Sequence, residues 1–155
     1  MSESLSFADR LRAGWTRLPP AVQDRVLSAI HAAVMQRLNE DPWYSSFSPP
    51  PQLEVLGASP RSGGLCIHFI ADHQNYCYAQ SGSDWADHNL FAGDLDLPQP
   101  PGGVLSPVRI QQVGHVHVSE QHWDEGYDRK PAVQRVRDAQ IAAILQTAGP
   151  HLDPR

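Results

Sequence analysis

Three histidines lie within eight positions of one another, between residues 115 and 122, and acidic residues follow them directly. His115 and His117 alternate with valines, so in a β-strand both imidazoles would project from one face while the valines pack on the other. The two backbones would then be roughly 7 Å apart, and His122 would follow from the turn beyond the strand. Imidazole nitrogens gathered in this way are typical zinc ligands.

The histidine cluster leads to two interpretations. In one, His115, His117 and His122 hold Zn²⁺, and Glu120 or Asp124 acts as the base of a metal-dependent hydrolase. In the other, the histidines lie on the solvated face of a strand and in a turn, and no cofactor is bound. Both interpretations depend on the segment near residue 115 being extended.

A second kind of chemistry is carried by Cys66 and His68, which alternate along another predicted strand and should share one of its faces. A thiol next to an imidazole can be activated as a nucleophile. The alternative is a cysteine packed in the core. Neither Cys66 nor Cys77 belongs to a Cys-x-x-Cys pair, so we expect free thiols in a reducing compartment.

Aspartates form a third group, which consists of Asp72, Asp84, Asp87, Asp94 and Asp96. Paired carboxylates can hold Mg²⁺ or Ca²⁺, but the spacing is not that of a calcium-binding loop. Aspartate also favours turns because its side chain hydrogen-bonds to nearby backbone groups. We therefore interpret these residues as solvated acids in loops, including the segment from residue 94 to 103.

Aromatic residues lie mostly outside the predicted helices, and Trp and Tyr are favoured anchors of protein-binding surfaces. We predict a binding face whose contact residues are Trp43, Tyr44, Trp85 and Asp87, with the acidic side chain steering a basic protein partner. On this hypothesis the chain is a small soluble protein-binding module of inhibitor, immunity or adaptor type. The alternative function is the metal-dependent hydrolase.

Composition limits these functions further. A chain of 155 residues is about one domain's worth, so we expect a single domain over 1–155. The net charge of −5 argues against general nucleic-acid binding and against docking on anionic lipid. We see no apolar run of about 20 residues and no apolar segment typical of a signal peptide, and therefore expect a cytoplasmic protein.

Hydrophobic periodicity predicts the elements that must position these residues. We expect helices over 6–13, 21–38, 83–91 and 130–147, and strands over 52–56, 65–71, 76–79 and 108–118, with a hairpin loop at 72–75. Gly114 is expected to mark a β-bulge. The predicted class is α+β, an antiparallel sheet of about four strands packed on one face against two longer helices, with a short N-terminal helix. An exposed strand edge would also allow two copies to pair as a homodimer.

Overall fold

The computed structural model describes residues 6–40, 51–61, 63–77, 85–98, 104–119 and 130–152. Its elements, in chain order, are α1 (Phe7–Thr16), α2 (Pro20–Asn39), β1 (Gln52–Arg61), β2 (Gly64–Cys77), β3 (Trp85–Pro98), β4 (Arg109–Ser119) and α4 (Lys130–Leu152). The four strands form one sheet in the order β1-β2-β3-β4, and each neighbouring pair is antiparallel. The structure confirms the predicted α+β class and the four-stranded antiparallel sheet.

The first two helices begin where the sequence signals place them. The Ser6 side chain accepts a hydrogen bond of 3.2 Å from the backbone N–H of Asp9, which caps α1. Helix α2 starts at Pro20, because a proline in the first helical turn has no N–H that needs a partner. Val26, Ile30 and Val34 recur every four residues on its fully buried face. None of the described helices is both long and apolar enough to cross a lipid bilayer.

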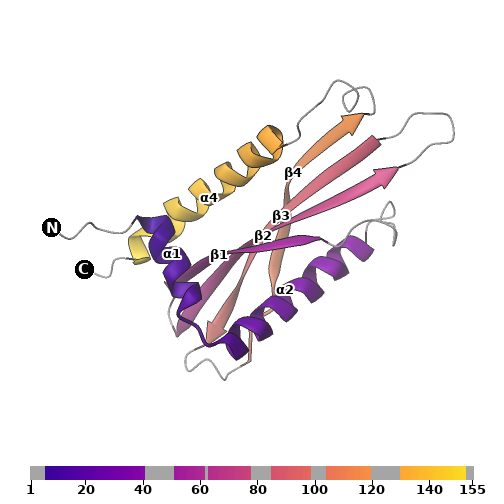
Figure 1. Ribbon diagram of the computed structural model, residues 1–155. Coiled ribbons are helices and arrows are strands. Elements are labelled where there is room, and N and C mark those ends of the chain that lie inside the picture. The colour runs from indigo at the N-terminus through magenta and orange to yellow at the C-terminus, as the bar shows by residue number, and fades with distance from the viewer. Residues whose placement is uncertain are drawn as a thin grey trace.

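Helices cover both faces of the sheet, whereas the sequence predicted cover on one face (Figure 1). Helix α2 packs against one face, in a core that contains Ile67 and Phe69 of β2. On the other face Ile70 packs with residues of α1 and α4, such as Leu11 and Ile141. Strand β2 has buried apolar residues on both sides, such as Phe69 on one and Ile70 on the other, and burying both requires a helical layer on each.

The middle of the chain differs from the prediction. Instead of turning at 72–75, β2 continues to Cys77, so residues 76–77 are extended as predicted but belong to β2 and not to a separate return strand. Residues 78–79 lie outside the described part of the chain. The predicted helix over 83–91 is wrong where the structure describes it, because Trp85–Pro98 forms β3. Residue 72 pairs with residue 90 and residue 77 with residue 85 along one long hairpin. Polar residues with weak strand propensity are held here by cross-strand pairing, which overrides local preference.

Strand β4 confirms that the segment near residue 115 is extended, and it contains the predicted bulge. Leu90 pairs with Gly114 while Phe91 pairs with Gln112, so Val113 is the extra residue. Helix α4 passes directly above this bulge. A Cβ atom at Gly114 would lie 2.7 Å from a methyl group of Val136, so the glycine allows the close approach of α4 to the sheet.

Two glycines with positive φ provide a matched test of the packing between α1 and β1. Gly57 has φ 152° and a Cβ there would overlap the backbone carbonyl of Leu11, whereas Gly63 has φ 80° and nothing within 4 Å. We expect Gly57→Ala to lower the free energy of unfolding by about 2–4 kcal/mol, from strain plus overlap. Gly63→Ala, with strain alone, should cost about 1 kcal/mol. Urea unfolding measures both, and equal losses would contradict this account.

Candidate functional site

Polar side chains from all four strands meet on the face of the sheet that α1 and α4 partly cover. His68 of β2 lies opposite Asp94 of β3, and Asp94 lies opposite Arg109 of β4. One row further along, Cys66 lies between Ser59 of β1 and Asp96 of β3. We call these residues, together with Arg61, the polar cluster: Ser59, Arg61, Cys66, His68, Asp94, Asp96 and Arg109.

Three members of the polar cluster offer metal-binding atoms close together. The donor atoms of Cys66, His68 and Asp94 all lie within 4.8 Å of one another, and no other group of three His, Cys, Asp or Glu residues does so among the residues that the structure describes. Cys66 is fully buried and His68 is 8% exposed. The ring of His68 is held by a hydrogen bond of 2.9 Å between its Nε2 and the hydroxyl of Ser59.

Two arginines neutralise the aspartates of the polar cluster. Arg109 donates to Asp94 through Nε and to both carboxylate oxygens of Asp96 through its terminal nitrogens, at 3.2 Å each. Arg61 donates to Asp96 at 2.9 Å. One terminal nitrogen of Arg109 also lies 4.0 Å from Cys66 Sγ. These ion pairs are partly exposed, so they align the side chains more than they stabilise the fold.

The pKa of the Cys66 thiol is raised to about 11, first by burial and next by the negative charge of Asp94. The thiol is therefore protonated at neutral pH. Cys66 and His68 share a strand face, as the sequence predicted, but this shift is opposite to the one that activates a nucleophilic cysteine. A packed, free cysteine, the alternative interpretation from the sequence, agrees with its burial.

Burial lowers the pKa of His68 below its usual 6.5, and Asp94 opposes this shift only in part. The imidazole is therefore neutral at pH 7 and has one unprotonated ring nitrogen. Neutral imidazole is the form that binds metals.

The hydrogen bonds from Arg109 are the largest cause of the lowered pKa of Asp96, so this carboxylate is ionised at neutral pH.

A pocket of about 320 Å³ opens beside the polar cluster, between the sheet and α4. Its lining residues are His68, Ala92, Gly93, Asp94, Arg109, Ile110, Gln111, Gln140 and Ile144. Two of the three potential metal ligands, His68 and Asp94, therefore border open space. A ligand in this pocket would lie next to those side chains and to Arg109.

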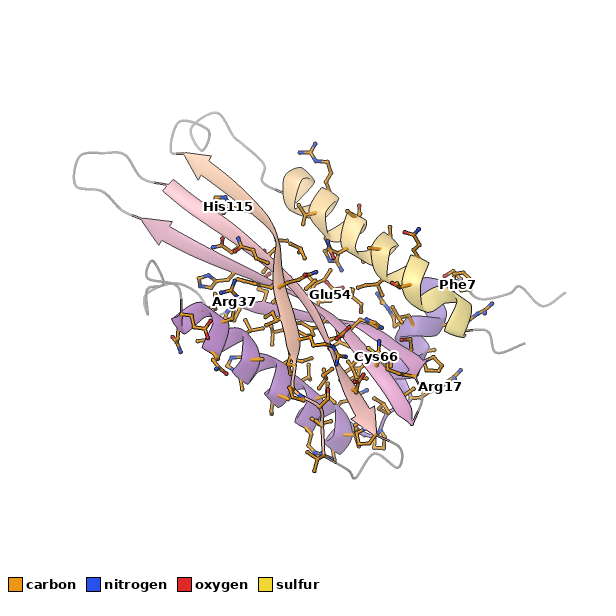
Figure 2. The ribbon with its side chains drawn as sticks, turned by 180° about the vertical axis from the view of Figure 1, so that it is seen from behind. Phe7, Arg17, Arg37, Glu54, Cys66 and His115 are labelled. Atoms are coloured by element: carbon orange, nitrogen blue, oxygen red, sulfur yellow. The ribbon has the colours of Figure 1, made fainter. Side chains whose placement is uncertain are left out.

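Of the predicted zinc ligands His115, His117 and His122, the structure describes only the side chain of His115, and it lies elsewhere on the sheet. His115 is exposed on β4 and lies opposite Asn89. Figure 2 shows that it lies far from Cys66 along the sheet. The backbone of His117 lies opposite that of Asp87, but its side chain falls outside the described residues, as does all of His122.

The predicted protein contacts are placed only in part. Trp85 and Asp87 belong to β3, and their side chains are outside the part of the chain that the structure describes. Trp43 and Tyr44 lie wholly outside it. The protein-binding face therefore stays a prediction.

Sequence reasoning missed three members of the polar cluster, namely Ser59, Arg61 and Arg109. It named Asp94 among the acids but did not pair it with His68. A signal for Asp94 was present, because Asp94, Leu95, Asp96 and Leu97 alternate between polar and apolar with the period of a strand. The prolines and glycines that follow favour a loop, and the assignment of this run to a loop is wrong because residues 94–98 belong to β3.

Comparisons with known proteins add no identification: no family model, curated protein or solved structure matches the chain. The geometry of the polar cluster and its pocket is therefore the basis for assigning a function.

The lowered pKa of His68 makes stability depend on pH in metal-free protein. The unfolded chain binds a proton near pH 6.5 that the folded chain binds only at lower pH, so the stability from neutral His68 is present above about pH 6.5 and is lost as the pH falls below it. We expect His68→Gln to show a smaller loss of unfolding free energy than wild type between pH 7.5 and 5, measured by urea unfolding in EDTA. His115→Gln controls for removal of an exposed histidine. An identical pH dependence of the unfolding free energy in wild type and His68→Gln would contradict a lowered pKa of His68 in the folded protein.

Proposed function

We propose that the protein binds a divalent transition-metal ion, Zn²⁺, through Cys66, His68 and Asp94. The observation that supports this proposal is the placement of three different zinc-binding groups within 4.8 Å of one another on two adjacent strands. Donor atoms around a tetrahedral zinc ion are roughly 3.5 Å apart, given bonds of about 2.0–2.3 Å. Small side-chain rotations are therefore enough to bring the three groups onto one ion.

Two of these ligands, Cys66 and His68, are already held in position in the metal-free protein. Backbone pairing fixes Cys66 and His68 on the same face of β2, and burial restricts their side chains. The bond between Ser59 and His68 Nε2 orients the ring, and when Nε2–H donates to the hydroxyl, Nδ1 is the nitrogen that binds metal. A hydrogen bond of this kind to the second ring nitrogen is typical of metal-bound histidines.

The fourth coordination position would face the pocket that His68 and Asp94 line. Three protein ligands with one open position are characteristic of catalytic zinc, whereas structural sites are closed by a fourth protein ligand. This supports the metal-dependent hydrolase that the sequence suggested, with its proposed centre moved from the histidine cluster to Cys66, His68 and Asp94. Water at the open position would be the nucleophile of such an enzyme.

Cobalt substitution provides the test. Untagged protein is expected to bind one Co²⁺ per chain with a sulfur-to-cobalt charge-transfer band in the near ultraviolet, because one ligand is a thiolate. Cys66→Ser should abolish the band, and Asp94→Asn should weaken binding by about tenfold or more. Cys77→Ser, which removes the other thiol, should leave the band unchanged.

Three results would contradict the metal-site proposal. One is no stoichiometric binding, and another is binding without the sulfur band. The third is binding that survives Asp94→Asn but is lost in the triple variant His115→Gln/His117→Gln/His122→Gln, which would move the site to the histidine cluster. Asp94 is 27% exposed, so its amide variant remains informative if Cys66→Ser does not fold.

A second candidate function is binding of another protein. The feature that supports it is the end of the sheet farthest from the polar cluster, where β2 and β3 extend beyond β1. In the described part of the chain, residues 73–77 of β2 pair with β3 but not with β1, and these strands run past β1 (Figure 1). Trp85 and Asp87 of β3 belong to this end by register, and β4 forms the neighbouring edge. We propose that this end forms part of the predicted binding face for a basic protein.

Affinity capture from an extract of the source cells tests this second function. The wild-type chain is expected to retain one partner in about a 1:1 ratio, and the charge reversal Asp87→Arg should reduce its capture about tenfold or more, because steering becomes repulsion. Asp24→Arg, at an exposed position on α2, makes the same charge change elsewhere and should retain the partner. Equal capture by both variants, or no stoichiometric partner, would exclude this surface.

A further inference from the structure

We infer that the metal-loaded site binds a small aliphatic carboxylate in the pocket of about 320 Å³, with its head group between the metal and Arg109. This inference rests on the proposed metal site and names the class of ligand that the same site accepts.

The charge of the polar cluster changes when metal binds. In the metal-free protein the two arginines and two aspartates cancel, because Arg109 pairs with both Asp94 and Asp96 while Arg61 pairs with Asp96. A Zn²⁺ ion adds two positive charges, and the thiolate of its cysteine ligand cancels one of them. One positive charge is left over beside the pocket. A single monovalent anion would restore neutrality in this partly desolvated place.

Arg109 is the group that responds to this change. Its Nε donates to Asp94, the carboxylate that the metal would also bind, so the ion and the guanidinium share one partner. Once the metal draws negative charge from the Asp94 carboxylate, the Nε of Arg109 interacts less strongly with that carboxylate. The Arg109 side chain is 48% exposed and lines the pocket, so it can turn toward a new acceptor without leaving Asp96. A carboxylate matches the planar donor geometry of a guanidinium.

The remainder of the pocket favours a short hydrocarbon body on this carboxylate. Ala92 and Ile144 supply apolar surface from β3 and α4, in the same pocket that His68 and Asp94 border. Gln140 of α4 adds an amide to the lining. Apolar walls with a few polar groups that fix orientation are typical of small-molecule sites. A phosphate would carry more negative charge than the polar cluster leaves unbalanced and would gain nothing from the apolar wall.

Calorimetry on the full-length, untagged protein tests the inference, with butyrate as the probe and butyramide as its neutral analogue. We expect butyrate to bind at least about tenfold more tightly to zinc-loaded than to EDTA-treated protein, and saturating butyrate to raise zinc affinity by the same factor, because coupling is reciprocal. Arg109→Gln should retain zinc but lose about tenfold or more in butyrate affinity. Arg37→Gln removes the same charge from an exposed residue of α2, outside the polar cluster and on the other face of the sheet, and should lose no more than about threefold.

The outcomes separate the carboxylate inference from the metal proposal. Zinc binding without any effect on butyrate affinity would overturn the inference and leave the metal site standing. Equal affinity for butyramide, tighter binding of inorganic phosphate, or equal losses in the two arginine variants would also overturn it. Absence of zinc binding would overturn the proposed function and the inference together.

Discussion

The register between β2 and β3 is the constraint on which the rest of the structure depends. It sets His68 opposite Asp94 and Cys66 opposite Asp96, and a shift by one residue would put Asp94 and Asp96 on the face opposite to that of Cys66 and His68. The register is strongly specified because Ile67 and Leu95, which pair with each other, are both fully buried against α2. The apolar core on one face therefore determines the chemistry on the other.

The second face combines apolar and polar regions. Ile70 and Ala92 pack beneath α1 and α4, while the polar cluster begins immediately beside them on the same two strands. Helix α4 is held over this boundary by an ion pair between Arg137 and Glu54 of β1 and by the close approach that Gly114 allows. The pocket exists because α4 covers the apolar part of this face and leaves the polar part open. A site at such an edge combines fixed ligands with access for a small molecule.

The sequence predicted those parts of the fold that local patterns determine. The four-residue repeat of α2, the extended segment near residue 115 and the bulge next to Gly114 are confirmed. It failed for β3, because Asn89, Asp94 and Asp96 have weak strand propensity and are held by partners in β2 that are distant in sequence. The shared face of Cys66 and His68 follows from alternation alone, so it could be predicted. Asp94 and Arg109 join them only through strand pairing, which a single sequence does not specify.

The central claim is that the β2–β3 pairing brings a thiol, an imidazole and a carboxylate onto one metal ion. X-ray absorption at the zinc edge, on protein loaded with one Zn²⁺ per chain, tests this claim most directly because it identifies the ligand atoms. The account predicts one sulfur at about 2.3 Å together with nitrogen and oxygen ligands at about 2.0–2.2 Å. A shell of nitrogen and oxygen alone, as the histidines near residue 115 would provide, would contradict it.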